Sequence, residues 1–385
     1  MKYINITMSL LVLIVSAGCE RQDQEHTIEI PYFEYLFVSF WEQMDKNYVF
    51  WNTDSTDWEE TYYQYRGIFS QLDINDDDDV KSSVRYFQEM TRNLTDGHYQ
   101  INFFHSAITD SVINPLLERK RKLGVLGNPY SYFLKDSVYL DEGYLIGSDE
   151  TNTLNYQPLR TICGEINGEI LYFACNFFGL SQSYYLNASK SVKASLDFFF
   201  DWIENNSVHP RGIIIDVRNN PGGDLADLNF LLGSLIGQPL HIGYCHYKNG
   251  DNPSNLTPRI DAHVNPTSNT KDIQLPIVVL ADSYSASLAE LVVSAVTAFP
   301  QGTFIGETTW GAVSPVVPFE VYASGSFEIE NFMHVQMSSC RFISLDENNY
   351  DGLGLTPNIS IPHSAEAYSQ GKDIQLEKAI ELFFN

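Results

Sequence analysis

Three closely spaced serines, Ser283, Ser285 and Ser287, follow a β-branched apolar run at 277–281. The run predicts a buried strand, and the small residues after it predict a tight turn that opens a helix near residue 288. A serine in such a turn lies at a helix N-terminus, where unpaired N–H groups and the helix dipole stabilise developing negative charge. This placement suits the nucleophile of an acyl-transfer enzyme, provided that a base activates one of the hydroxyls.

Two glycines, Gly222 and Gly223, follow a second unbroken apolar run at 212–217. The run predicts a strand buried on both faces, as in an α/β sheet, and a helix is expected at 225–235. Glycines between them let backbone N–H groups approach a ligand, which suits an oxyanion site. A nucleotide cradle has poor support because neither GxxxxGK[ST] nor GxGxxG is present. A tight turn without any ligand is the remaining alternative.

One histidine, His98, directly follows Thr95-Asp96-Gly97 at the end of a helix predicted over 80–94. A histidine in this place can satisfy the last helix carbonyls and interact with the helix dipole, which is a purely structural role. It can also act as a general base. The residues alone favour the structural role and leave the catalytic one open.

Four ordered motifs resemble the tail-specific, or carboxyl-terminal processing, serine peptidases, a family that includes the core of tricorn protease. They are Asp216-Val217-Arg218-Asn219-Asn220-Pro221-Gly222-Gly223, Ser285-Ala286-Ser287-Leu288-Ala289-Glu290, Gly306-Glu307-Thr308-Thr309-Trp310-Gly311 and Gly354-Leu355-Thr356-Pro357-Asn358-Ile359. The resemblance covers roughly residues 40–384, with Asn358 in place of the usual aspartate. It implies an α/β fold with a crotonase/ClpP-like catalytic domain and a small N-terminal helical domain.

The resemblance singles out Ser287, which stands three residues before Glu290, as the nucleophile. Family members with a Ser–Lys dyad carry a lysine where this chain has Ala312, and no lysine lies between Lys271 and Lys372. Tricorn-like members use instead a histidine from a helical N-terminal segment, which Asp96-Gly97-His98 resembles. His98 is therefore the expected base.

A late carboxylate is implied to orient the histidine. Asp351 is the first candidate, with Asp346 and Glu347 as rivals. The implied reaction is cleavage of a peptide or protein substrate through an acyl-enzyme, without a metal or another cofactor. Backbone N–H groups of Gly222 or Gly223, and of Leu288, would hold the oxyanion.

Two other functions fit the same motifs. An inactive relative that binds peptides in the same groove is supported by the loss of the lysine. A crotonase-like acyl-CoA enzyme would share the fold and the oxyanion site, but acyl-CoA is cytoplasmic and the N-terminus predicts export.

Residues 1–19 predict a bacterial lipoprotein signal. Lys2 precedes an apolar run at 8–15 and then Ser16-Ala17-Gly18-Cys19. Small residues before a cysteine resemble the lipoprotein processing site, although Ser16 stands where a leucine is usual. Cys19 would then be lipidated and anchor the protein in the cell envelope, on the periplasmic side or facing the surface. Ordinary cleavage and an uncleaved anchor are the alternatives.

The remaining chain divides into four expected parts. Residues 20–30 form a tether, 31–104 a helical domain that carries His98, 105–165 a β-rich connection without a full PDZ domain, and 166–385 the catalytic domain. The net charge of −26 argues against nucleic acid and anionic membrane surfaces as partners. The five cysteines include no CxxC pair, so a structural zinc site is not expected. Oligomeric state cannot be inferred from these patterns.

Overall fold

A computed structural model describes residues 30–126, 136–186, 189–205, 209–250, 252, 254–267, 270, 272–317 and 325–384. The expected signal, the lipidated Cys19 and nearly all of the tether lie outside the described residues. Within the described residues, no helix is both long and apolar enough to cross a bilayer.

The unit expected to be catalytic, here called the catalytic unit, is built on a seven-stranded sheet in the order β14-β10-β9-β6-β5-β4-β3. Its strands are β3 (Leu145–Leu154), β4 (Gln157–Ile166), β5 (Ile170–Cys175), β6 (Gly212–Asp216), β9 (Ile277–Ala281), β10 (Gly302–Gly306) and β14 (Ile359–Ser360). Strands β5, β6, β9, β10 and β14 run parallel to one another, and β4 and β3 are added at one edge as antiparallel strands. Every residue of β6 and β9 is buried, as the two apolar runs predict. The expected α/β fold is confirmed.

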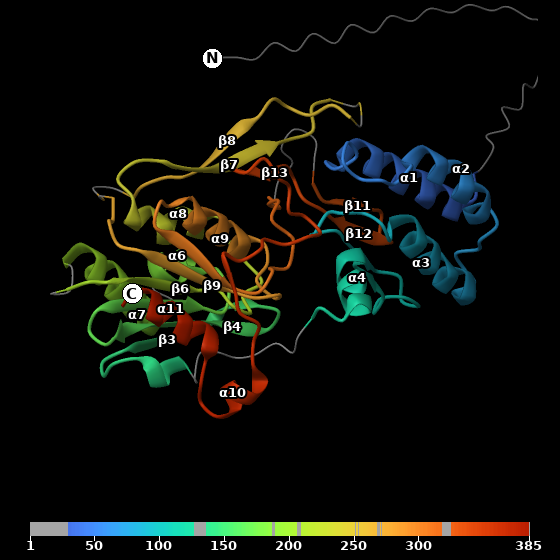
Figure 1. Cartoon of the computed structure of the whole chain (residues 1–385). Helices are drawn as coiled ribbons and strands as arrows, with labels where there is room; N and C mark the ends of the chain where they lie inside the picture. Colours follow the sequence, from blue (N-terminus) through green and yellow to red (C-terminus); the bar gives the residue numbers. More distant parts are fainter. Residues whose placement is uncertain are drawn as a thin grey trace, which may run out of the picture.

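Helices cover both faces of this sheet (Figure 1). One face packs with α6 (Leu180–Tyr185), α7 (Lys190–Asn205), α8 (Ala226–Leu232) and α9 (Leu288–Ala298) in the largest apolar core. The other face packs on α11 (Ile374–Leu382). The remaining elements of this unit are α10 (Ala365–Ser369), the 3-10 turns η1 (Ser137–Tyr139) and η2 (Gly233–Leu235), and a small sheet of β7 (Leu240–His246), β8 (Ile260–Val264) and β13 (Arg341–Ser344).

The N-terminal unit lies beside the catalytic unit (Figure 1). It contains α1 (Tyr32–Asn47), α2 (Trp58–Phe69), α3 (Asp77–Thr91), α4 (Pro115–Leu123), and a sheet in the order β11-β12-β1-β2. The strands are β1 (Gln100–Phe103), β2 (Val112–Ile113), β11 (Phe327–Ile329) and β12 (Met333–Gln336). Aromatic residues of the three helices share one core with these strands.

The late strands β11 and β12 therefore complete the N-terminal unit. The antiparallel register pairs Gln100 with Gln336 at one end of the β1–β12 ladder. Continuing this register by two residues sets His98 opposite Ser338. A segment expected in a separate helical domain is thus fixed against the chain that follows the nucleophile.

The division of 105–165 differs from the expectation. The segment contains α4, which lies with the N-terminal unit, and β3 and β4, which belong to the main sheet. The boundary at 165–166 would cut the hairpin between β4 and β5, whose Asn167-Gly168 turn has positive φ at both residues. This is the primed turn that Asn-Gly favours. The sheet therefore begins near Leu145, because β4 pairs directly with β5.

Candidate active site

Ser287 occupies a strained position between β9 and α9. It is the residue before the first turn of α9, and its backbone has φ 56° and ψ −121°. A positive φ is uncommon for a residue with a side chain and costs about 1–3 kcal/mol. A sharp turn of this kind between a strand and a helix presents the hydroxyl of a nucleophilic serine. Ser287 is partly exposed, so its hydroxyl can meet a substrate.

The neighbouring serines differ from Ser287 in burial or bonding. Ser285 is fully buried, and its Oγ donates to the Val217 carbonyl over 2.7 Å and accepts from the Asp282 N–H over 2.9 Å. These bonds tie the serine turn to the end of β6. Ser283 is also buried. Of the three candidate nucleophiles, Ser287 is the one at the helix start with a partly exposed side chain.

The Glu290 carboxylate joins the Ser287 turn to the turn at 309–312. It accepts from the N–H groups of Ser287 over 3.2 Å, Gly311 over 2.8 Å and Ala312 over 2.7 Å. It also accepts from the Thr309 hydroxyl over 2.5 Å. The group is fully buried, and this burial raises the pKa of Glu290 to about 6. Its role is structural, as its place in the first helix turn suggests.

Two backbone N–H groups beside Ser287 are available for an oxyanion. Gly222 lies so close that a Cβ there would sit 2.6 Å from the Ser287 Cβ, but its own N–H donates to the Asn220 side chain over 2.9 Å. No hydrogen bond among the described residues uses the N–H of Gly223 or of Leu288. The structure therefore favours Gly223 over Gly222 as the partner of Leu288.

Arg218 and Asp216 hold this glycine turn and do not face the serine. The Arg218 guanidinium is fully buried and forms ion pairs with Asp136, Asp216 and Asp373 at 2.6–2.9 Å. Asp373 caps α11, so the network connects β6 to the C-terminal helix. Coulombic interaction with Asp216 and the other carboxylates raises the pKa of Arg218 well above its usual value, against the effect of burial.

The His98 segment packs directly on the 309–312 turn. A Cβ at Gly97 would lie 1.9 Å from the Gly311 carbonyl oxygen and 2.5 Å from the Ala312 Cα. Ala312 in turn donates to Glu290, which holds the Ser287 turn. The residue before His98 thus packs on Ala312, the position at which the sequence resemblance predicts a lysine in Ser–Lys peptidases. Within the described residues, no hydrogen bond joins His98 to Ser287.

A buried aspartate orients the His98 segment through Ser338. The Asp96 carboxylate accepts from the N–H of His98 over 2.9 Å, and from the N–H and Oγ of Ser338 over 2.8 and 2.7 Å. The Ser338 Oγ lies 3.4 Å from His98 Nδ1. Desolvation lowers the pKa of His98 from 6.5 to about 4, and its hydrogen bond with the Ser314 backbone acts in the opposite direction. The imidazole is therefore neutral at pH 7 and able to accept a proton.

Asp351 is bonded to Ser314, and no hydrogen bond among the described residues joins it to the His98 ring. Its carboxylate accepts from the Ser314 Oγ over 2.5 Å and from Asn349 over 2.9 Å. Because Ser314 also bonds to His98 through its backbone, Asp351 can influence the imidazole only through Ser314. Burial, with a further contribution from the Asp96 charge, raises the pKa of Asp351 to about 7. Among the described residues no hydrogen bond joins Asp351 directly to the ring, whereas Ser338, which bonds Asp96, reaches His98 Nδ1 over 3.4 Å.

The two rival carboxylates are engaged elsewhere. Glu347 is exposed and paired with Arg259. Asp346 accepts from the Tyr350 hydroxyl over 2.5 Å. Ser338 and Ser314 have no signature in the sequence, since nothing in their local pattern indicates that they lie beside His98. The pairing of β1 with β12 is the feature that reveals them.

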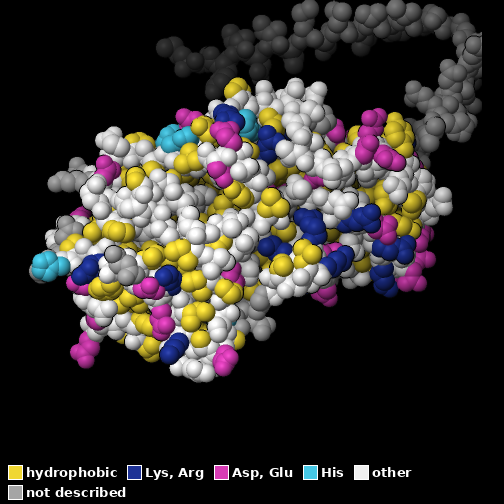
Figure 2. All heavy atoms as spheres, viewed as in Figure 1, with side chains coloured by type: hydrophobic (Ala, Val, Ile, Leu, Met, Phe, Trp, Pro, Cys, Tyr) yellow, Lys and Arg dark blue, Asp and Glu magenta, His cyan; other side chains and the backbone are white. Residues whose placement is uncertain are grey.

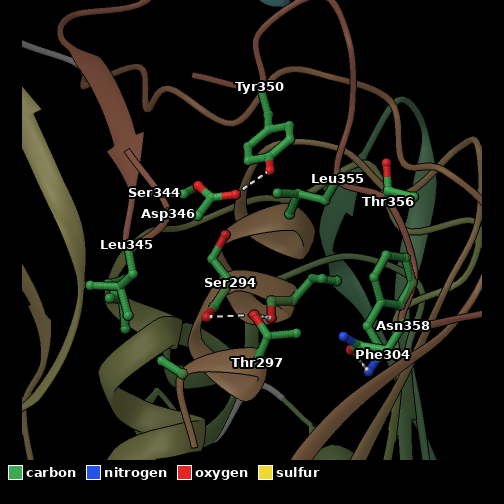
Figure 3. Close-up of a pocket in the computed structure, with 13 residues that line it drawn as sticks. Ser294, Thr297, Phe304, Ser344, Leu345, Asp346, Tyr350, Leu355, Thr356 and Asn358 are labelled. Atoms are coloured by element: carbon green, nitrogen blue, oxygen red, sulfur yellow. Dashed lines mark hydrogen bonds between the residues drawn. The ribbon is translucent and has the colours of Figure 1, made fainter. Parts of the chain in front are cut away.

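A cavity of about 250 Å³ lies along α9, away from the reacting groups (Figure 3). Ser294 and Thr297 of α9 contribute to its wall, with Ser344, Tyr350 and other residues of the late loops. None of Ser287, His98 and Asp351 lines it. The cavity therefore does not mark the centre of the chemistry.

Comparisons with known proteins agree with the geometry. The model of peptidase family S41 matches residues 182–361. A candidate Tricorn-like protease C-terminal subunit of Sulfurisphaera tokodaii is 22% identical over 90% of this chain and 42% of its own length. Tricorn protease of Thermoplasma volcanium is 26% identical over 44% of this chain and 14% of its length. The chain thus spans less than half the length of either relative.

A solved structure supports the fold over nearly the whole chain. The crystal structure of a candidate peptidase from Parabacteroides merdae has a TM-score of 0.67 and 21% identity. It covers 91% of this chain and 96% of that one. Because it covers 91% of this chain, the match extends well beyond the residues 182–361 that the family model matches.

The first prediction concerns the contact of Gly97 with the 309–312 turn. Gly97→Ala should displace His98, because the new Cβ has no space beside the Gly311 carbonyl. A misplacement of about 1 Å can lower a reaction rate about 100-fold. The rate of covalent labelling of Ser287 by a fluorophosphonate measures the loss. Gly67→Ala on α2 is the matched control, since a Cβ there meets nothing within 4 Å. Equal rates for both variants would contradict the proposed contact.

The second prediction concerns the charge of His98. Its pKa near 4 lies below the unfolded value, so the folded chain binds fewer protons between about pH 4 and 6.5. In this window its contribution to stability increases with pH. NMR of ¹⁵N-labelled histidine, assigned with His98→Gln, should show a neutral His98 ring at pH 6. A titration midpoint of the His98 ring at or above pH 6.5 would show that the ring is not desolvated.

Proposed function

We propose that this chain, in which residues 182–361 match the model of peptidase family S41, is a serine peptidase that cleaves peptide bonds through an acyl-enzyme on Ser287 with His98 as base. The observation that supports this most strongly is the strained Ser287 turn. The N–H groups of Leu288 and of Gly223, which follows the Gly222 that contacts Ser287, have no hydrogen-bond partners among the described residues. Glu290 bonds the Ser287 turn to the 309–312 turn, on which Gly97 packs next to His98.

In the acylation step, His98 accepts the Ser287 proton as Oγ attacks the carbonyl carbon of the substrate. This requires an imidazole nitrogen within about 3 Å of Oγ in the substrate complex, and catalytic contacts are often longer before substrate binds. Asp96, acting through Ser338, would keep the ring oriented while it carries the positive charge. Asp351 remains a second candidate for this role, acting through Ser314.

The carbonyl oxygen becomes negatively charged in the tetrahedral intermediate. The N–H groups of Gly223 and Leu288 would donate to it, and Leu288 adds the positive end of the α9 dipole. Such a donor contributes about 3 kcal/mol to the stability of the transition state. His98 then protonates the leaving amine, and a water molecule attacks the acyl-enzyme with the same base. Cleavage within chains and cleavage at carboxyl termini both proceed by these steps.

An inactive, peptide-binding protein is the second candidate function. It is favoured by Ala312 in place of the lysine and by the missing hydrogen bond between His98 and Ser287. The same oxyanion donors would then bind a peptide carbonyl without cleavage. The two functions differ in whether Ser287 can form a covalent bond.

The third prediction separates these functions. A fluorophosphonate probe should label the wild-type protein, and Ser287→Ala should abolish labelling. His98→Ala should reduce its rate by about 100-fold or more, since a positioned base contributes 10²–10⁴-fold. His209→Ala, on an exposed histidine, is the matched control and should label as wild type. Labelling that persists in Ser287→Ala, or an unchanged rate in His98→Ala, would refute the mechanism.

The fourth prediction concerns location in the cell. We propose that the protein is exported and attached to a bacterial membrane through lipid on Cys19, on the basis of the sequence of residues 1–19. Growth with a tagged fatty acid should label the full-length protein and place it in the membrane fraction. Cys19→Ala should abolish both, whereas Cys163→Ala, a buried cysteine of β4, should change neither. Membrane attachment without fatty-acid labelling would contradict the lipid anchor.

A further inference from the structure

Lys120 is the buried member of a basic group on α4. Four consecutive residues of this helix, at 119–122, are lysine or arginine. Arg121 and Lys122 are exposed, and basic side chains gather over α4 on the surface (Figure 2). Lys120, in contrast, is only 7% exposed. A lysine is rarely buried without a partner, because removing its charge from water is costly.

The Lys120 ammonium group contacts the 309–312 turn. Its Nζ donates to the Thr309 carbonyl over 3.3 Å and lies 5.3 Å from the centroid of the Trp310 ring. Thr309 also donates its hydroxyl to Glu290, so one residue bonds both charged groups. Lys120 and Glu290 therefore meet at Thr309 from opposite units of the molecule.

Lys120 is the cation that faces Glu290. Burial lowers the pKa of Lys120, and the Glu290 charge acts in the opposite direction. Arg119 also lies on α4, but it donates to the Arg92 carbonyl and its charge faces Tyr48, Asp54 and Glu118. Three other titratable groups, Asp96, His98 and Asp351, lie on described segments that pack on the 309–312 turn. The turn itself contains no titratable residue, and Glu290 is the titratable residue of α9.

We propose that Lys120 is a positioning residue of the active site, which holds the Ser287 turn through Thr309 and the ionised Glu290 carboxylate. The inference rests on the proposed peptidase function. Ala312 leaves the turn without the lysine of the Ser–Lys members, and Lys120 brings a positive charge to the same turn from the N-terminal unit. Lys120 bonds a backbone carbonyl and not Ser287, so it acts through Glu290 and is not the base.

The negative charge of Glu290 is needed to hold the Ser287 turn, because the carboxylate accepts four hydrogen bonds and donates none. An ionised carboxylate accepts from Ser287, Thr309, Gly311 and Ala312, whereas a protonated one must itself donate. Removing Lys120 leaves a buried carboxylate without its counter-charge, which favours protonation. The Ser287 and Ala312 backbones would then be held less firmly, and the rate would fall at a pH where His98 is still neutral.

The first test is the pH profile of fluorophosphonate labelling in Lys120→Met. We expect an acidic limb about one pH unit higher than in wild type, because one pKa unit is a tenfold change in the acid dissociation constant. The rate should therefore be about tenfold lower at pH 5 and about twofold lower at pH 7. Lys120→Arg keeps the charge and should retain the wild-type limb. Lys122→Met removes an exposed charge from the same helix and should behave as wild type. An unchanged rate and limb in Lys120→Met would overturn the proposal.

The second test measures melting temperature against pH and does not need activity. The folded pKa of Glu290, about 6, lies above its unfolded value, so its contribution to stability is lost as pH rises toward 6. In Lys120→Met this loss should extend to higher pH and lower the melting temperature further between pH 6 and 8. Glu290→Gln in the same background should remove the added pH dependence. If Lys120→Met lowers the melting temperature equally at all pH values, Lys120 contributes by packing alone, and the proposal is wrong.

The two tests also separate failure of the inference from failure of the proposed function. If wild type is not labelled, the peptidase proposal fails, and the melting series still decides whether Lys120 supports Glu290. If Lys120→Met does not fold, the double variant Lys120→Met/Glu290→Gln decides, because it leaves no buried carboxylate without a counter-charge. We expect the double variant to fold. Its failure to fold would contradict the coupling of the two residues.

Discussion

The arrangement around Ser287 depends on the hydrogen bonds of the Glu290 carboxylate. This buried group bonds the backbone of the nucleophile on one side and the 309–312 turn on the other. The strained backbone of Ser287 can persist because such bonds over-determine it. The same turn is the surface on which the His98 segment packs, since Gly97 leaves room for the Gly311 carbonyl. One carboxylate therefore connects Ser287 to the turn on which the His98 segment packs.

The second constraint is the non-local pairing of β1 with β12. These strands come from opposite ends of the chain, and their register sets His98 opposite Ser338. Asp96 bonds both residues and is buried with them. In the proposed mechanism the N-terminal unit supplies both the histidine base and the lysine that contacts Thr309. The proposed active site therefore depends on the docking of this unit on the 309–312 turn.

Local patterns in the sequence were enough to predict the serine turn at 283–287 with the strand before it and the helix after it. The apolar runs of β6 and β9, the small residues between β9 and α9, and the Asn167-Gly168 turn each act over a few residues. The choice of Ser287 over its neighbours needed the family resemblance, and the bonds of Ser285 now give it a physical reason. The choice of Gly223 over Gly222 as an oxyanion donor could be made only from the three-dimensional structure. It depends on the hydrogen bond that the Gly222 N–H donates to the Asn220 side chain.

What could not be predicted depends on contacts between distant residues. Ser338 lies 240 residues from His98, and Thr309 lies 189 residues from Lys120. Spacing along the chain carries no information about such contacts. The same reason explains why Asp351 was expected at the ring when it bonds Ser314, and why 105–165 was treated as one connection when α4 and β4 belong to different units.

The central claim is that His98 from the N-terminal unit serves Ser287 of the catalytic unit. The most direct measurement is a crystal structure of the protein with a phosphonate covalently bound to Ser287. The account predicts a His98 ring nitrogen within about 3 Å of the serine or phosphonate oxygen, and the phosphoryl oxygen between the N–H groups of Gly223 and Leu288. A bound phosphonate with His98 still turned away, and the ammonium group of Lys120 at the serine oxygen, would contradict it.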